Sequence, residues 1–281
     1  MSYARKLSET TTHRGNLCVG IDPMPSVLNA WGLATDVKGL EACARGIVEE
    51  LGERIAVFKP QSAFFERHGS AGIAVLEETL AALRDVGTLS VLDVKRGDIG
   101  STMAGYAQAY LSDGAPLAAD SITVSPYLGY GSLSPALDLA EASGRGVFVL
   151  ALTSNPEGAA VQHAVNGERA VAAGVVEGVT ASNATASGEG RLGSVGLVVG
   201  ATVGEAVCRL GIDLLRANGP LLAPGIGAQG AGPAELESVF GSARRHVLAS
   251  TSRGVLKAGP SIEALRTAAL AATHEAAAAL R

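Results

Sequence analysis

The sequence predicts an α/β protein, a (β/α)8 TIM barrel that forms a single domain over residues 1–281. Eight short runs rich in Val, Ile, Leu and Ala alternate with helix-like stretches. Each run is almost continuously apolar, which is typical of parallel strands buried on both faces. Eight strand–helix units in about 250 residues match the size of this barrel. An open, doubly wound parallel sheet is the alternative, and the number of units favours the barrel.

The strands are predicted where the apolar runs are strongest. They cover Leu17–Asp22, Ile55–Pro60, Leu89–Lys95, Ser121–Pro126, Gly146–Ser154, Ser194–Thr202, Leu221–Gly227 and His246–Gly254.

Apolar residues at spacings of three and four predict helices between the strands, most clearly over Val37–Glu53, Gly69–Val86 and Val203–Asn218. Residues 156–193 form a long insertion after the fifth strand. The Ala-rich tail, residues 261–280, is expected to be a last helix that covers the barrel.

Composition excludes several classes of protein. The chain has 281 residues, is 47% hydrophobic and carries a formal net charge of -5, so it can bury a core and is not disordered. It lacks the Lys/Arg stripe of a nucleic-acid-binding protein. No apolar run approaches the ~20 residues of a membrane helix, and the polar N-terminus does not resemble a signal peptide. Three scattered cysteines suggest a reduced, cytoplasmic protein.

Charged residues stand at the carboxyl ends of the first three strands, where such barrels carry their chemistry. The pattern Asp93-x-Lys95-x-x-Asp98 ends the third strand, Lys59 ends the second and Asp22 ends the first. Residues two apart on a strand share a face, so Asp93 and Lys95 should both point into the barrel mouth. We expect an alternating array of carboxylates and ammonium groups. A purely structural ion-pair network is the alternative.

A second pattern, Gly225-x-Gly227-x-x-Gly230, follows the seventh strand, and Arg253 follows the eighth. Loops after these two strands form the usual phosphate site of a barrel. A dinucleotide-binding turn would need an acidic residue about 20 positions later, which is missing here. The pattern therefore favours a phosphate site, and glycines used only for tight turns are the alternative.

No metal site is expected. The five histidines and three cysteines show no ligand spacing, and none of the histidines ends a strand. Cys18 lies inside a strand and is interpreted as a core residue. Ser154 ends the fifth strand, so a functional role and a capping role are equally plausible for it.

Taken together, these motifs resemble the orotidine 5′-phosphate decarboxylase family, in its longer bacterial branch. The resemblance runs from about residue 17 to residue 254. It rests on Val19–Asp22, Phe58–Pro60, Asp93–Ile99, Ser125–Gly129, Thr153–Pro156, Ala223–Gly230 and Arg253, and on the insertion 156–193.

The resemblance implies cofactor-free decarboxylation of orotidine 5′-monophosphate (OMP) to uridine 5′-monophosphate (UMP), a step of de novo pyrimidine biosynthesis. It implies that Lys95 stabilises and protonates the carbanion at pyrimidine C6, that Asp93 lies beside the departing carboxylate, and that Lys59 holds Asp93 and a ribose hydroxyl. Asp98 and Thr102 would reach the ribose in the neighbouring subunit's site, which implies a homodimer with shared active sites.

The resemblance also implies the contacts that hold the nucleotide. Asp22 would bind ribose, Ser154 the pyrimidine edge, Gln229 the phosphate and base, and Arg253 the phosphate together with the loop that contains Gly227. No nucleic acid or membrane is expected as a partner.

Two other functions remain open at this point. Related barrels are metal-dependent phosphosugar lyases and decarboxylases, which share the third-strand motif but have a carboxylate metal ligand where Lys59 stands. A Lys beside Asp22 and Asp93 would disfavour Mg²⁺ there. The other alternative is a non-catalytic barrel that senses nucleotides, for which Lys95 would have no role.

Overall fold

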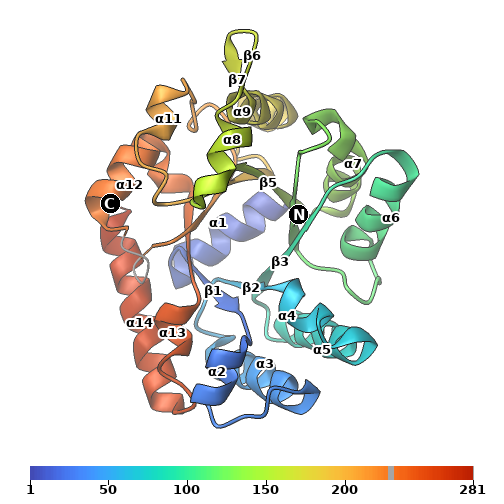
Figure 1. The fold of residues 1–281 in the computed structure, drawn as a ribbon, viewed down its shortest axis with the longest axis vertical. Helices are drawn as coiled ribbons and strands as arrows, with labels where there is room; N and C mark the ends of the chain where they lie inside the picture. The colour runs from blue at the N-terminus through green and yellow to red at the C-terminus, as the bar shows by residue number, and fades with distance from the viewer. Residues whose placement is uncertain (227–230, 281) are drawn as a thin grey trace.

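The computed structural model describes residues 1–226 and 231–280 of the chain. Within them, eight parallel strands close into a barrel in which each strand pairs with its neighbours in the sequence, so the predicted (β/α)8 architecture is confirmed (Figure 1). The strands are β1 (Leu17–Ile21), β2 (Val57–Pro60), β3 (Leu89–Arg96), β4 (Ser121–Val124), β5 (Gly146–Leu152), β8 (Val195–Val199), β9 (Leu221–Pro224) and β10 (Val247–Thr251).

Helices surround the barrel (Figure 1). Two of the clearest predictions are confirmed by α3 and α5. The helices that lie outside the insertion are α1 (Tyr3–Arg14), α2 (Pro25–Ala30), α3 (Val37–Leu51), α4 (Ser62–Glu66), α5 (Gly69–Asp85), α6 (Gly100–Leu111), α7 (Ser134–Ser143), α11 (Ala206–Arg209), α12 (Pro233–Phe240), α13 (Arg253–Leu256) and α14 (Ile262–Ala279), with 3-10 turns η1 (Tyr130–Leu133) and η3 (Gly241–His246).

The helix predicted over Val203–Asn218 is wrong. The described structure there contains only the four-residue helix α11 (Ala206–Arg209). Three residues in the segment have left-handed backbones, Gly204 at φ 59°, Gly211 at φ 64° and Asn218 at φ 48°. A right-handed helix cannot continue through such residues, and the apolar periodicity did not reveal them.

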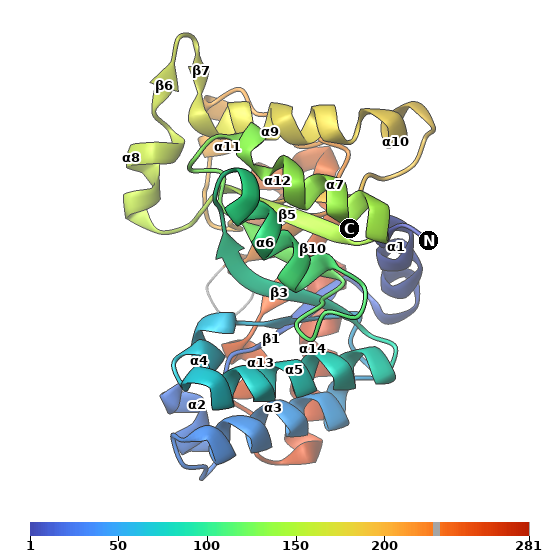
Figure 2. The same cartoon turned by 90° about the vertical axis from the view of Figure 1, so that its right-hand side faces the viewer.

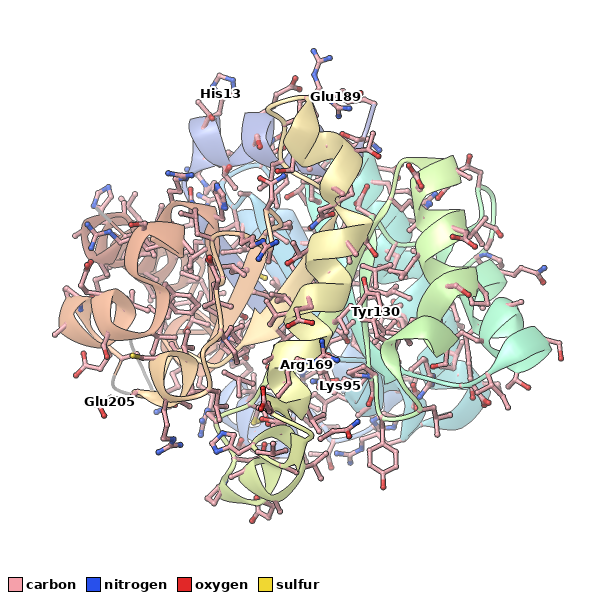
Figure 3. All side chains as sticks on the ribbon, turned by 90° about the horizontal axis from the view of Figure 1, so that it is seen from above. His13, Lys95, Tyr130, Arg169, Glu189 and Glu205 are labelled. Atoms are coloured by element: carbon pink, nitrogen blue, oxygen red, sulfur yellow. The ribbon has the colours of Figure 1, made fainter. Side chains whose placement is uncertain are left out.

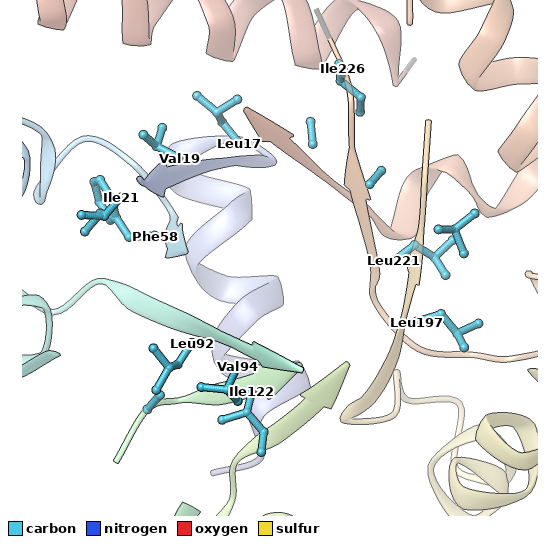
Figure 4. Packing of buried hydrophobic residues seen from close by; sticks show 14 of the residues in the cluster. Leu17, Val19, Ile21, Phe58, Leu92, Val94, Ile122, Leu197, Leu221 and Ile226 are labelled. Carbon is cyan, nitrogen blue, oxygen red and sulfur yellow. The ribbon is translucent and has the colours of Figure 1, made fainter. Parts of the chain in front are cut away.

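Alternation along the strands produces two apolar layers. One face of each strand packs beneath the helices, as Leu17, Val19 and Ile21 of β1 do (Figure 4). The other face fills the inside of the barrel, where Val57 and Val91 belong to the inner cluster. Lys59 follows Val57 by two residues on β2, and Asp93 follows Val91 by two residues on β3, so they lie on the same inner face. The inside of the barrel therefore changes from apolar to charged toward the carboxyl ends of the strands.

Helix α1 lies across the amino-terminal end of the barrel. Its residues Tyr3 and Leu7 are buried in the inner cluster, and the Tyr3 ring meets Phe148 edge to face with 6.0 Å between ring centroids. Figure 2 shows α1 on the opposite side of the molecule from α2, α4 and α8. One end of the barrel is therefore covered by its own chain, and the charged residues lie at the other end.

Residues 156–193 contain a 3-10 turn η2 (Pro156–Gly158), α8 (Ala159–Gln162), the hairpin β6–β7 (Val165–Asn166 and Arg169–Ala170), α9 (Val171–Ser182) and α10 (Ala184–Gly188). Helix α9 packs against β5 and β8, so it takes the place of the helix that connects two barrel strands. The hairpin projects from the body of the molecule (Figure 2). We call residues 156–170 the arm.

The C-terminal helix α14 packs against β1, α3 and α12, so the last helix of the chain lies beside its first barrel strand. Among the described residues, no helix is both long enough and apolar enough to cross a membrane.

Candidate functional site

Asp93 is the centre of a charged cluster at the open end of the barrel. Its Oδ2 lies 3.1 Å from Nζ of Lys59 on β2, and its Oδ1 lies 2.6 Å from Nζ of Lys95 on the same strand. The side chains of Asp93 and Lys59 are 8% and 10% exposed, whereas that of Lys95 is 47% exposed. One carboxylate thus joins a buried ammonium group to one that solvent can reach.

Two neutral side chains also donate hydrogen bonds to this carboxylate, and the sequence patterns predicted neither of them. Gln61 Nε2 donates to Oδ2 of Asp93 at 2.9 Å, and the Thr123 hydroxyl donates to Oδ1 at 2.7 Å. Gln61 stands two residues after Lys59, on the same face of the chain, so the period of two could have revealed it. Thr123 lies inside β4, where nothing in the local pattern marks it.

The cluster shifts the pKa of both buried members. Burial alone would raise the pKa of Asp93, but the ammonium groups of Lys59 and Lys95 and the hydrogen bonds from Lys95 and Thr123 outweigh it and hold this pKa well below its usual range. Burial likewise favours neutral Lys59, yet the charges of Asp93 and Asp22 raise its pKa above the ordinary value. Both groups are therefore charged at neutral pH.

Lys95 has a left-handed backbone, with φ 45°. The pairing of β3 with β4 shifts register between Leu92 and Arg96, and the Lys95 N–H donates to Thr123 Oγ1 at 3.0 Å. A non-glycine residue in this region is strained and persists only where its surroundings impose it. Thr123 therefore holds both the Asp93 carboxylate and the turn that aims Lys95.

Asp22 lies next to the cluster but does not join it. The described residues include no ion pair or hydrogen bond between Asp22 and Lys59. The Asp22 carboxylate lies over Gly20, where an added Cβ would stand 3.0 Å from Oδ2 and 2.7 Å from Cβ of Ser252. Asp22 Oδ1 and Ser252 Oγ are buried without a hydrogen-bond partner among the described residues, which is costly unless a ligand satisfies them.

Asp22 and Ser252 line a cavity of about 260 Å³ at the carboxyl ends of β1, β9 and β10. Lys59 and Arg253 also line it, and Arg253 is exposed at the first position of α13. Two larger cavities lie away from the charged cluster, one of about 460 Å³ beside α7 and α10 and one of about 500 Å³ beside α9. The predicted residues Gly227 and Gln229 fall outside the described residues.

Three other predicted residues stand apart from the Asp93 cluster. Asp98 lies before α6 and its carboxylate accepts from the Ile99 N–H at 2.8 Å. Thr102 is exposed on α6, and Ser154 is exposed just after β5. None of the three shares a described hydrogen bond with Lys59, Asp93 or Lys95.

Among the residues that the structure describes, no group of three or more His, Cys, Asp or Glu side chains is placed to hold a metal ion. The cluster has the composition for electrostatic and proton-transfer chemistry, because a fixed carboxylate and an accessible ammonium group are held 2.6 Å apart. Lys59, which pairs with the same carboxylate, lines the cavity of about 260 Å³.

Comparison with known proteins shows which family the chain resembles. Residues 15–268 match the model of the orotidine 5′-phosphate decarboxylase / HUMPS family. The chain is 59% identical to an orotidine 5′-phosphate decarboxylase of Streptomyces coelicolor, over 95% of this chain and 94% of the relative. It is 60% identical to one of Salinispora arenicola, with the same coverage.

Solved structures agree with these matches. A putative orotidine 5′-phosphate decarboxylase from Streptomyces avermitilis superimposes with a TM-score of 0.94 and 58% identity, over 99% of this chain and 96% of that one. The OMP decarboxylase of Leishmania donovani superimposes with a TM-score of 0.79 and 32% identity, over 100% of this chain and 99% of that one.

Proposed function

The chain belongs to the orotidine 5′-phosphate decarboxylase / HUMPS family, and on that premise we propose that it converts OMP to UMP and CO2 in de novo pyrimidine biosynthesis. The family description covers more than one reaction. Relatives that are 58–60% identical to this chain carry the decarboxylase name. The Lys59–Asp93–Lys95 cluster is the observation that carries the proposal, because it supplies a proton donor and a fixed negative charge side by side.

The reaction breaks the bond between C6 of the pyrimidine and its carboxylate. The electron pair of that bond stays on C6, CO2 leaves, and a proton must then reach C6. We assign this proton to Lys95, whose ammonium charge would also stabilise the developing carbanion. The Lys95 side chain is 47% exposed, so solvent can return the proton after each turnover. The proposal needs no cofactor.

Asp93 has a second role in this scheme. Its pKa stays well below the usual range, so the group is anionic when the substrate carboxylate enters. Two unit charges ~4 Å apart repel by about 4 kcal/mol at an effective dielectric constant of ~20, and this repulsion ends when CO2 leaves. We give stabilisation by Lys95 the larger weight, because it acts on the charge that forms in the transition state. Lys59 would hold Asp93 and a ribose hydroxyl.

Binding of the nucleotide is assigned to the cavity beside the cluster. Asp22 would accept hydrogen bonds from ribose hydroxyls, and its unpartnered Oδ1 supports this role. Arg253 on the cavity wall would bind the phosphate dianion. Ser154 would meet the pyrimidine edge, and Gln229 and the loop at Gly227 would complete the phosphate and base contacts. The phosphate is remote from C6, so its binding energy can serve to position the reacting base.

A homodimer is also proposed, with Asp98 and Thr102 entering the site of the partner subunit. Support comes from three large apolar side chains near Asp98 that solvent reaches, Ile99 at 62%, Tyr127 at 79% and Leu128 at 52% exposed. Their loops are adjacent, because the Ser125 N–H donates to the Arg96 carbonyl at 2.8 Å. Exposed apolar groups gathered in this way are typical of an interface between protein chains.

A cytoplasmic location is proposed from the thiols. Cys18 and Cys43 are buried and Cys208 is exposed, and all three are free cysteines. Free thiols are the usual state of cysteine in reducing compartments.

The test is the loss of OMP absorbance on incubation with purified protein and excess chelator. Steady conversion to UMP supports the proposal. Inactivity on OMP together with turnover of a phosphosugar in Mg²⁺ would identify the metal-dependent lyase instead, and nucleotide binding without turnover would identify a sensor.

A further inference from the structure

Gln162 on α8 fastens the arm to the end of β5. The Thr153 N–H donates to Gln162 Oε1 at 2.9 Å, and Gln162 Nε2 donates to Thr153 Oγ1 at 2.6 Å. A backbone N–H can only donate, so the amide oxygen of Gln162 must face it, and the two bonds define one orientation of the side chain. Gln162 thus forms hydrogen bonds with both the backbone and the side chain of Thr153.

The hydrogen-bond network continues through the residues that follow Thr153. The Thr153 hydroxyl donates to Asn155 Oδ1 at 2.7 Å, and Asn155 Nδ2 donates to Glu157 at 3.1 Å. Ser154 therefore stands between two residues whose side chains are fixed. Its backbone also lies against Gly200 at the end of β8, where an added Cβ would stand 3.1 Å from the Ser154 nitrogen.

Close packing reinforces this network. Gly158 in η2 lies under it, where an added Cβ would stand 2.7 Å from Thr153 Oγ1 and 3.0 Å from Gln162 Nε2. The backbone of Gly158 has φ -59° and ψ -30°, which any residue adopts. Space, not conformation, is what requires glycine here.

The arm is supported at two further points. Arg169 in the hairpin pairs with Glu177 on α9 (Figure 3 labels Arg169). An Nη atom of Arg209 on α11 lies 3.4 Å from Nδ1 of His163. Both contacts tie the residues that follow Gln162 to neighbouring helices, and Gln162 itself is held by its two hydrogen bonds to Thr153.

From these contacts we propose that Gln162 is a positioning residue, which holds Ser154 in place to meet the pyrimidine base. The inference deepens the proposed function and rests on it, because it takes the Ser154 contact from there. Gln162 itself touches Thr153 and not the substrate. Its removal should weaken recognition of the base and leave recognition of ribose and phosphate unchanged.

Two ligands separate these effects. UMP carries the base, ribose and phosphate, and ribose 5-phosphate lacks the base. Gln162→Ala should weaken UMP binding about threefold to tenfold, the size of one displaced neutral hydrogen bond, and should not change binding of ribose 5-phosphate. Calorimetric titration of both ligands gives the two ratios. Gln162→Glu keeps an acceptor for the Thr153 N–H and should lose less than Gln162→Ala.

A second variant tests the same network without touching Gln162. Gly158→Ala adds a methyl group against Thr153 and should also weaken UMP binding selectively. Gly188→Ala on α10 is the matched control, because an added Cβ there meets nothing within 4 Å. Its affinities for both ligands should equal those of the wild type.

The route through Ser154 is tested in a Ser154→Ala background. If Gln162 acts through Ser154, the double variant binds UMP as weakly as Ser154→Ala alone. An additive loss, an equal loss for both ligands, or no loss in Gln162→Ala would overturn the inference and leave the decarboxylase proposal intact. A wild-type protein that binds UMP no better than ribose 5-phosphate would contradict the proposed function and the inference with it.

Discussion

Nζ of Lys95 lies 2.6 Å from Oδ1 of Asp93, and the backbone that carries this ammonium group is left-handed, with φ 45°. The two observations belong together. An extended strand would continue past Asp93 in regular register, whereas the irregular pairing after Leu92 turns Lys95 back toward the carboxylate. The strain is offset by two hydrogen bonds of the Thr123 hydroxyl, which accepts from the Lys95 N–H and donates to Asp93 Oδ1.

The double role of Thr123 predicts the effect of Thr123→Val. This change keeps the shape of the side chain and removes both its donation to Asp93 and its acceptance from the Lys95 N–H. We expect kcat for OMP to fall about tenfold to a hundredfold, since an unsatisfied buried group costs about 1–3 kcal/mol.

Thr88→Val is the matched control for this substitution. Thr88 is buried just before β3, and its hydroxyl donates to the Ile55 carbonyl at 2.8 Å. The control should lower the free energy of unfolding and leave kcat unchanged. If both variants keep wild-type kcat, Thr123 does not position the reacting groups.

The depressed pKa of Asp93 predicts how stability depends on pH. Asp93 has a lower pKa in the folded protein than in the unfolded chain, so its stabilising effect is complete above its unfolded pKa of about 4 and is lost as pH falls through the folded value. At pH 7, Asp93→Asn should lower the free energy of unfolding by about 3–5 kcal/mol, because it leaves buried Lys59 without its carboxylate. The difference from the wild type should begin to shrink below about pH 4.

Urea unfolding between pH 2 and pH 7 measures this difference. Asp85→Asn, at an exposed carboxylate at the end of α5, is the control and should show no comparable effect. A difference that is small at pH 7, or that grows as the pH is lowered, would show that Asp93 is not held as a buried anion.

Arg253→Ala tests the phosphate site. Losing a desolvated charged pair costs about 2–5 kcal/mol, which corresponds to tens to thousands of fold in affinity. The loss in kcat/KM should be large for OMP and slight for the unphosphorylated nucleoside orotidine. Steady-state kinetics with both substrates measures this, and Arg54→Ala at an exposed arginine before β2 is the control. Equal losses for nucleotide and nucleoside would mean that Arg253 supports the fold instead.

Shared active sites predict that two inactive variants can rescue each other. Lys95→Ala and Asp98→Ala each remove one component of every site in their own homodimers. In a mixed dimer, one site carries both changes and the other carries neither. After complete exchange of subunits, activity should rise to about a quarter of the wild-type value, because half of the dimers are mixed and each has one intact site.

The experiment mixes the two purified variants and follows activity against time. Mixing each variant with itself is the control and should give no increase. Should the mixture stay inactive although subunits exchange, Asp98 would act in the site of its own chain.

The sequence predicted the charged members of the site because a charge after a buried apolar run needs a partner. Lys59 and Asp93 stood out in this way, and they do meet at 3.1 Å. Gln61 and Thr123 escaped notice because neutral polar side chains are common in strands. The position of Asp22 could not be predicted either, since its turn over Gly20 depends on contacts with Ser252, which is distant in the sequence.

The strands of the fold could be predicted from the sequence, but some of the helices could not. Parallel strands buried on both faces leave a strong apolar signal, and all eight were located. The short α11 was not, because Gly204 and Gly211 take left-handed backbones that apolar spacing cannot show. The position of α1 across the end of the barrel could not be predicted either, because its sequence is mostly polar and only Tyr3, Ala4 and Leu7 are buried.

The most direct test of the central claim is the rate of OMP decarboxylation by Lys95→Ala beside that of the wild type, in excess chelator. The wild type should convert OMP to UMP, and Lys95→Ala should show no measurable turnover while still binding UMP, because it lacks the proton for C6 and the charge that stabilises the carbanion. Lys38→Ala, at an exposed lysine on α3, should match the wild type. Turnover by Lys95→Ala at the wild-type rate would contradict the account.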